Sequence, residues 1–60
     1  MYVPRMRERV QVAGRNELFL VVWVDEKRET ADLIPLQPGS GIEQDVPFSQ
    51  IEPYRENIPN

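Results

Sequence analysis

Between Leu18 and Val24 the chain reads Leu-Phe-Leu-Val-Val-Trp-Val, the longest apolar run in its 60 residues. β-Branched and aromatic residues dominate this run, a composition typical of a β-strand. Alternate residues of a strand face opposite sides, and both sides of this one are apolar. The run is far too short to cross a bilayer as a helix, so we expect no membrane partner. It therefore predicts the central strand of a small all-β domain, with one apolar side left to explain.

Shorter strand signals lie on both sides of this run. The expected strands span residues 8–12, 17–25, 30–36, 41–46 and 51–54, with a 3₁₀ turn at 48–50. Turn residues separate them, as at Gly14, in the charged segment Asp25–Glu29 and at Pro38-Gly39. Six prolines and three glycines leave no stretch of convincing helical periodicity. Five short strands at near-regular spacing predict a meander closed into a five-stranded barrel.

The length allows a single domain, 1–60, with flexible ends expected near residues 1–6 and 55–60. A core of this size rarely supplies more than about 3–5 kcal/mol, so small domains usually need a disulfide, a metal or self-association. The chain has no cysteine and no histidine, which removes disulfides and the ligands that zinc prefers. Self-association therefore gains weight, and no cofactor is expected. The lack of cysteine also fits a cytoplasmic location, which we expect for this chain.

The two apolar sides of the central run have two interpretations. Either the strand is long and bent, so that its ends pack in different small cores, or one side is exposed and covered by another copy of the chain. A contiguous exposed apolar patch usually marks an interface, and residues 31–36 show the same two-sidedness. We therefore expect a homo-oligomer, with a different protein as the alternative partner. The candidate interface residues are Phe19, Val21, Trp23, Ile34 and Leu36.

Arginines alternate at the N-terminal end of the chain. If this stretch is extended, its three arginines face one side, and together with a fourth in the next turn they form a candidate phosphate-contacting row. The members of this row are Arg5, Arg7, Arg9 and Arg15. The other interpretation is a solvated edge that pairs with the acidic remainder of the chain. The net charge of −3 and the lack of interleaved aromatic residues make nucleic-acid binding an alternative function rather than the leading one.

The segment from Val46 to Tyr54, Val-Pro-Phe-Ser-Gln-Ile-Glu-Pro-Tyr, resembles the closing segment of Src-homology-3 (SH3) domains. In that family a strand ends at a Val-Pro pair, a 3₁₀ turn follows and a short strand seals the barrel. The order of elements from Glu8 onward also resembles that fold and its Tudor relatives. The resemblance implies an SH3-like barrel, a fold that serves many functions. Pro47 matches the family's groove proline, but Gln50 stands where the family has a tyrosine, so we expect no usual polyproline groove.

A weaker resemblance links residues 41–52 to the last strands of plasmid-type dihydrofolate reductases, small barrels whose tetramer builds one active site around a central pore. In this comparison Gln44 falls on the family's pore glutamine and Val46-Pro47 on its Tyr-Pro. Three of the four residues 43–46 differ from the family's Val-Gln-Ile-Tyr. The resemblance implies an oligomeric pore-site reductase as the enzyme alternative. With no histidine, the chain has no general base beside a serine, and its acidic residues match no metal-ligand pattern. We therefore expect a non-enzymatic binding or assembly module.

Overall fold

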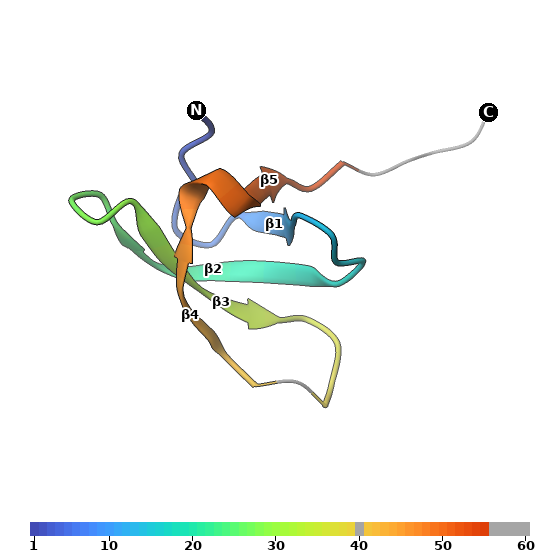
Figure 1. Cartoon of the computed structure of the whole chain (residues 1–60). Coiled ribbons are helices and arrows are strands. Elements are labelled where there is room, and N and C mark those ends of the chain that lie inside the picture. Colours follow the sequence, from blue (N-terminus) through green and yellow to red (C-terminus); the bar gives the residue numbers. More distant parts are fainter. Residues whose placement is uncertain (40, 56–60) are drawn as a thin grey trace.

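The computed structural model describes residues 1–39 and 41–55, and these form an all-β fold. Within them, five antiparallel strands make one sheet: β1 (Arg9–Val12), β2 (Leu18–Asp25), β3 (Thr30–Pro35), β4 (Glu43–Pro47) and β5 (Ile51–Pro53). A 3₁₀ turn, η1 (Phe48–Gln50), connects β4 to β5 as the sequence predicts. The strand order is β4-β3-β2-β1-β5 (Figure 1). Each predicted strand is present within two residues of its expected bounds.

The sheet is not closed into a barrel. β4 and β5 form its two edges and are not hydrogen-bonded to each other in the described part of the chain. The sheet curls, and the chain passes from β4 through η1 back to β5 beside β1 (Figure 1). Closure fails because Pro47 and η1 separate the two edges, and because Pro53 has no N–H with which to extend a ladder. The predicted barrel is therefore corrected to an open, curled sheet.

One face of the sheet carries the core, and we call it the inner face. Four residues at its centre, Val10, Phe19, Val21 and Leu33, have no exposed surface. Strands β1, β2, β3 and β5 and the 3₁₀ turn supply the buried apolar residues, namely Val10, Val12, Phe19, Val21, Ala31, Leu33, Phe48 and Ile51. Fully burying a side chain of this kind stabilises the fold by about 1.5–3 kcal/mol. The opposite side of the sheet, where the other side chains of the strands point, is the outer face.

A β-bulge in β2 decides which residues of the apolar run face the core. The pairing of β2 with β3 contains one extra residue, Val22, between the paired positions Val21 and Trp23. An extra residue of this kind bends the strand and changes which side chains point inward. Before the bulge Phe19 and Val21 belong to the core, and after it Val24 packs against the same core. The strand is bent, as one interpretation of the sequence holds, but its two ends share one core rather than two.

The N-terminal segment 1–8 packs against the sheet without forming a strand. Pro4 is buried, and Tyr2 is half-buried against the core. The Arg7 N–H donates to the Val21 carbonyl at 2.7 Å, and Arg7 has a φ of 68° in a turn. Residues 1–6 contain both buried and exposed side chains, and the flexibility expected for this end stays a prediction. Of the other expected flexible end, 55–60, residues 56–60 lie outside the described residues.

Candidate functional site

The outer face of β2 and β3 carries a cluster of apolar side chains. Leu20 pairs with Ile34 across the two strands, and the Leu36 N–H donates to the Leu18 carbonyl at 2.9 Å, which extends the pairing past the end of β3. Trp23 follows on the same face beyond the bulge and is 61% exposed, while Leu36 is 47% and Ile34 is 42% exposed. These five residues, called the outer apolar patch below, are Leu18, Leu20, Trp23, Ile34 and Leu36.

The outer apolar patch shares three members with the interface predicted from the sequence. Trp23, Ile34 and Leu36 are exposed, as an interface requires. The assignment of Phe19 and Val21 is corrected, because both are fully buried inside the chain. The prediction assumed strict alternation along the run, whereas the bulge restarts the alternation before Trp23 and leaves it on the outer face. Leu18 and Leu20 complete the patch and are not among the residues predicted from the sequence.

One sequence signal indicates the correct face. Asp32 lies in the middle of β3, and a charged residue in a strand of a small domain marks its own side as the solvent side. Ile34 and Leu36 have the same parity as Asp32, whereas Ala31 and Leu33 have the opposite parity and are buried. Asp32 therefore identifies the outer face of the sheet. The apolar run of β2 contains no residue that could do so.

Arg9 and Asp32 border the patch on opposite sides. Arg9 pairs with Leu20 across β1 and β2, so it lies one strand away from the patch on the same face. Asp32 pairs with Trp23 and lies on the side of the β4 edge. The Asp32 carboxylate accepts a hydrogen bond from the Asp45 N–H at 2.9 Å, which holds it at this border. The patch therefore has one cationic border and one anionic border.

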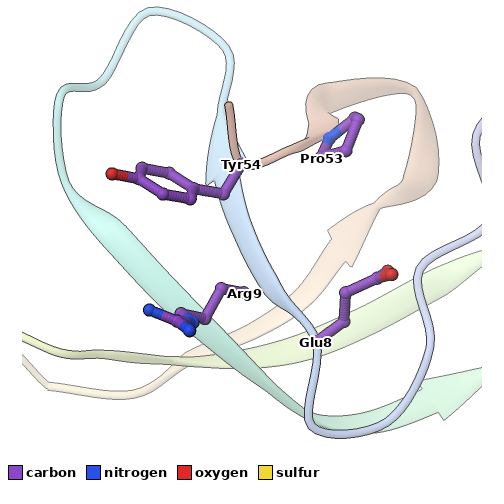
Figure 2. Close-up of a pocket in the computed structure, with 4 residues that line it drawn as sticks. All are labelled: Glu8, Arg9, Pro53 and Tyr54. Carbon is purple, nitrogen blue, oxygen red and sulfur yellow. The ribbon is translucent and has the colours of Figure 1, made fainter. Parts of the chain in front are cut away.

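An open hollow adjoins the cationic border. Its lining residues, Glu8, Arg9, Pro53 and Tyr54, surround a volume of about 370 Å³ (Figure 2). The Tyr54 N–H donates to the Arg9 carbonyl at 3.3 Å, which extends the pairing of β1 with β5 by one residue. Tyr54 therefore lies beside Arg9. The side chains of Tyr54 and Arg9 point to one side of the hollow, and those of Pro53 and Glu8 point to the other (Figure 2). An aromatic ring and a guanidinium thus lie next to the patch.

A larger hollow of about 640 Å³ lies along residues 1–6 of the N-terminal segment, where Val24 and Glu26 complete its lining. The Tyr2 hydroxyl, which also lines it, donates a hydrogen bond to the Glu8 carboxylate. Burial raises the pKa of Tyr2, and the hydrogen bond to Glu8 raises it further, so the phenol keeps its proton. This contact joins the start of the N-terminal segment 1–8 to its end, just before β1. Its role is therefore structural rather than acid–base chemistry.

The arginines predicted to contact phosphate do not form one row. Arg5 and Arg7 belong to the N-terminal segment, where a turn at residues 6–7 prevents the extended conformation that the prediction needs. Arg9 lies on β1 at the border of the patch. Arg15 lies in the connection between β1 and β2, where two carboxylates surround it. The structure therefore does not bring these four residues together as a basic track.

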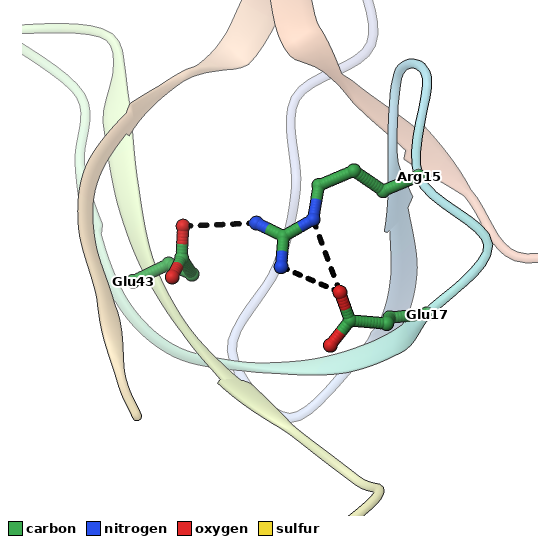
Figure 3. A network of polar contacts seen from close by, with 3 residues as sticks. All are labelled: Arg15, Glu17 and Glu43. Atoms are coloured by element: carbon green, nitrogen blue, oxygen red, sulfur yellow. Dashed lines mark hydrogen bonds and ion pairs between the residues drawn. The ribbon is translucent and has the colours of Figure 1, made fainter. Parts of the chain in front are cut away.

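Arg15 bridges two parts of the sheet (Figure 3). Its guanidinium nitrogens lie 2.5 Å from Glu17 Oε1 and 3.0 Å from Glu43 Oε1, and the guanidinium lies 5.2 Å from the centre of the Phe19 ring. The hydrogen bond to Glu17 raises the pKa of Arg15, and the charges of both carboxylates add to this effect. Because Glu43 begins β4, the bridge ties the β1–β2 connection to the edge strand. Arg15 therefore serves the fold, and its charge is compensated within the chain.

Gln44, the residue aligned with the reductase pore glutamine, is exposed on the edge strand β4. Its neighbour Asp45 has a φ of 56° where the pairing of β4 with β3 shifts by one residue. Among residues 1–39 and 41–55, no group of three acidic side chains is placed to hold a metal ion. In the same residues, no helix is long and apolar enough to cross a membrane.

Comparisons of the chain with protein-family models, with curated protein sequences and with solved structures found no match. The candidate site therefore rests on the geometry and chemistry of this chain. Its most distinctive feature is the outer apolar patch with its two oppositely charged borders.

Proposed function

We propose that this chain is a non-enzymatic assembly module that binds a second copy of itself through the outer apolar patch. The observation that supports this proposal is the adjacency of Trp23, Ile34 and Leu36, each more than two-fifths exposed, on one face of the sheet. Single exposed apolar residues are ordinary on protein surfaces, but a contiguous patch with a polar border marks an interaction surface. Tryptophan in particular is enriched at the energetic centres of interfaces.

The proposal includes an SH3-like architecture for the module. Val46-Pro47, the 3₁₀ turn η1 and the short strand β5 follow one another as they do in the segment that closes such barrels. The pairing of β5 with β1 supports the same architecture, because it joins the last strand to the first. The proposed architecture is an open, curled variant of that barrel, in which β4 and β5 are the two edges of the sheet.

A second copy of the chain suits the patch for two reasons. A 60-residue chain without cysteine has a small core and no covalent support, so burying the patch adds stability where it is scarce. The two borders carry opposite charges, and a suitably oriented two-fold axis between the two faces brings each border toward its opposite. A standard interface covers about 800 Å² per partner, roughly one sixth of the 4662 Å² surface of the chain. A partner on the patch therefore also covers the strands beside it.

Sedimentation equilibrium tests this function. We expect the wild-type chain to be dimeric at about 100 μM, and Trp23→Ser to raise the dimer Kd by about tenfold or more because it removes the largest exposed apolar side chain of the patch. Val3→Ser is the matched control, since Val3 is also exposed but lies in the N-terminal segment. A wild-type chain that stays monomeric at several times this concentration contradicts the proposal, as does an equal effect of the two substitutions.

A further inference from the structure

We infer that Arg9 of one copy forms an ion pair with Asp32 of the other, twice per dimer, and that these pairs set the crossing angle of the two sheets. The inference rests on the proposed function, because it names the partner residues for the outer apolar patch. It goes beyond that function because it names the charged residues that contact the second copy.

The positions of the two residues support the pairing. Arg9 lies on β1 level with Leu20, and Asp32 lies on β3 level with Trp23, beyond the bulge. The two charges therefore stand at diagonal corners of the patch. A two-fold axis through the middle of the patch brings these corners together when the strands of the two sheets cross near a right angle, one of the two preferred arrangements of packed sheets. An isologous interface then makes the contact twice, once in each direction.

The existing contacts of Arg9 leave it suited to this role. Arg15 and Arg28 form ion pairs with carboxylates of their own chain. In the part of the chain that the structure describes, Arg9 forms no ion pair. It lies on the outer face, next to the patch residue Leu20. A guanidinium has five N–H donors in a planar fork that matches a carboxylate. An acidic residue supplied by the second copy would occupy this fork.

Asp32 is the acidic residue best placed to meet it. The hydrogen bond from the Asp45 N–H to Asp32 Oδ1 fixes the carboxylate at the border and leaves it able to accept further hydrogen bonds. The Asp45 carboxylate lies 3.5 Å from Arg28, so its charge is partly compensated within the chain. Glu52 is also on the outer face, but it pairs with Gln11 at the far side of β1 from the patch.

A double-mutant cycle on the dimer Kd tests the pairing. Asp32→Asn removes the charge and keeps the acceptor for the Asp45 amide, so the fold is preserved. In the wild-type background we expect Asp32→Asn to raise the Kd by about threefold, because an attraction is lost. In the Arg9→Glu background we expect the same substitution to lower the Kd by about threefold, because a like-charge repulsion is relieved. A sign reversal of this kind indicates that the two residues lie close together, because sites more than about 7–10 Å apart usually act additively.

Lys27→Glu is the matched control for Arg9→Glu, since it changes the net charge equally at an exposed position of the β2–β3 turn. We expect Arg9→Glu to raise the Kd about tenfold more than Lys27→Glu does. If Asp32→Asn acts in the same direction in both backgrounds while Trp23→Ser still weakens the dimer, the pairing is overturned and the proposed function stands. If the wild-type chain is monomeric, both are overturned.

Discussion

Phe19 and Trp23 lie four residues apart in β2 and have opposite environments, one with no exposed surface and the other 61% exposed. Phe19→Ala is expected to cost about 3–5 kcal/mol, because it removes a buried aromatic ring and leaves a cavity. A loss of this size matches the whole stability of a core this small, so the variant should be unfolded at 25 °C. Trp23→Ala should change the stability of the monomer by less than about 1 kcal/mol. Urea denaturation, followed by circular dichroism at low protein concentration, measures both effects.

The same pair shows what single residues reveal and what they hide. Both side chains are large and apolar, so their chemical character alone does not separate core from surface. The separation depends on the register with β3, which is a property of two strands and not of either residue. If Trp23→Ala unfolds the monomer as completely as Phe19→Ala, the assignment of faces in β2 is wrong.

Glu29 gives a second test at the scale of one residue. It has a φ of 54° in the turn between β2 and β3, a left-handed conformation that glycine adopts without the steric cost of a Cβ atom. Glu29→Gly should therefore raise the free energy of unfolding by up to about 1 kcal/mol. The hydrogen bond from the Phe48 N–H to the Glu29 carbonyl does not depend on the side chain and should persist.

Glu26→Gly is the control for this prediction, because Glu26 lies in the same turn without a positive φ. It should leave the stability unchanged or lower it, since glycine loses more backbone freedom on folding. Thermal denaturation of both variants compares them. Equal losses of stability would show that the left-handed conformation of Glu29 carries no cost.

At the scale of elements, the bulge in β2 makes a prediction about deletions. Val22 is the extra residue that interrupts the regular alternation of side chains in β2. Without it, Val21 still faces inward, Trp23 outward and Val24 inward. The variant that lacks Val22 should therefore stay folded with a loss of about 1–3 kcal/mol. Its two-dimensional ¹H–¹⁵N NMR spectrum should keep the dispersion of a folded β protein.

Deletion of Leu20 is the control, because it shortens the same strand by the same length within the regular register. It turns Phe19 away from the inner face or breaks the pairing with β3, since a shift of one residue exchanges the two faces of a strand. This variant should be unfolded. Equal tolerance of the two deletions would be inconsistent with the bulge at Val22.

The elements could be predicted from the sequence to within two residues, because their signals are local. Gly14 has the positive φ of 79° that its turn requires, and Pro47 ends β4 just before the 3₁₀ turn. The bulge could not be predicted in this way, since nothing in Val21-Val22-Trp23 distinguishes the extra residue. Sheet closure could not be predicted either, because it depends on contacts between β4 and β5, which the intervening turn and Pro53 keep apart.

At the scale of the whole molecule, the outer apolar patch is what the fold of one chain leaves unexplained. The inner face accounts for the buried apolar residues of β1, β2, β3, β5 and the 3₁₀ turn. The Arg15 bridge connects the β1–β2 connection to β4, and the Tyr2 hydroxyl joins the start of the segment 1–8 to its end. No comparable contact covers Trp23, Ile34 and Leu36 within the described residues, and all three are exposed. Part of this surface was predictable, because a strand that is apolar on both sides is expected to be covered on both sides. The residues that form it became clear only from the register.

Trp23 is the single tryptophan of the chain, so its fluorescence reports directly on the outer apolar patch. An indole covered by a second copy emits at shorter wavelength than one exposed to water. We expect the emission maximum to shift to longer wavelength on dilution from about 100 μM to about 1 μM, as mass action separates the copies. The shift should follow the Kd obtained by sedimentation. An emission maximum that is typical of exposed tryptophan and unchanged over this range would contradict the account.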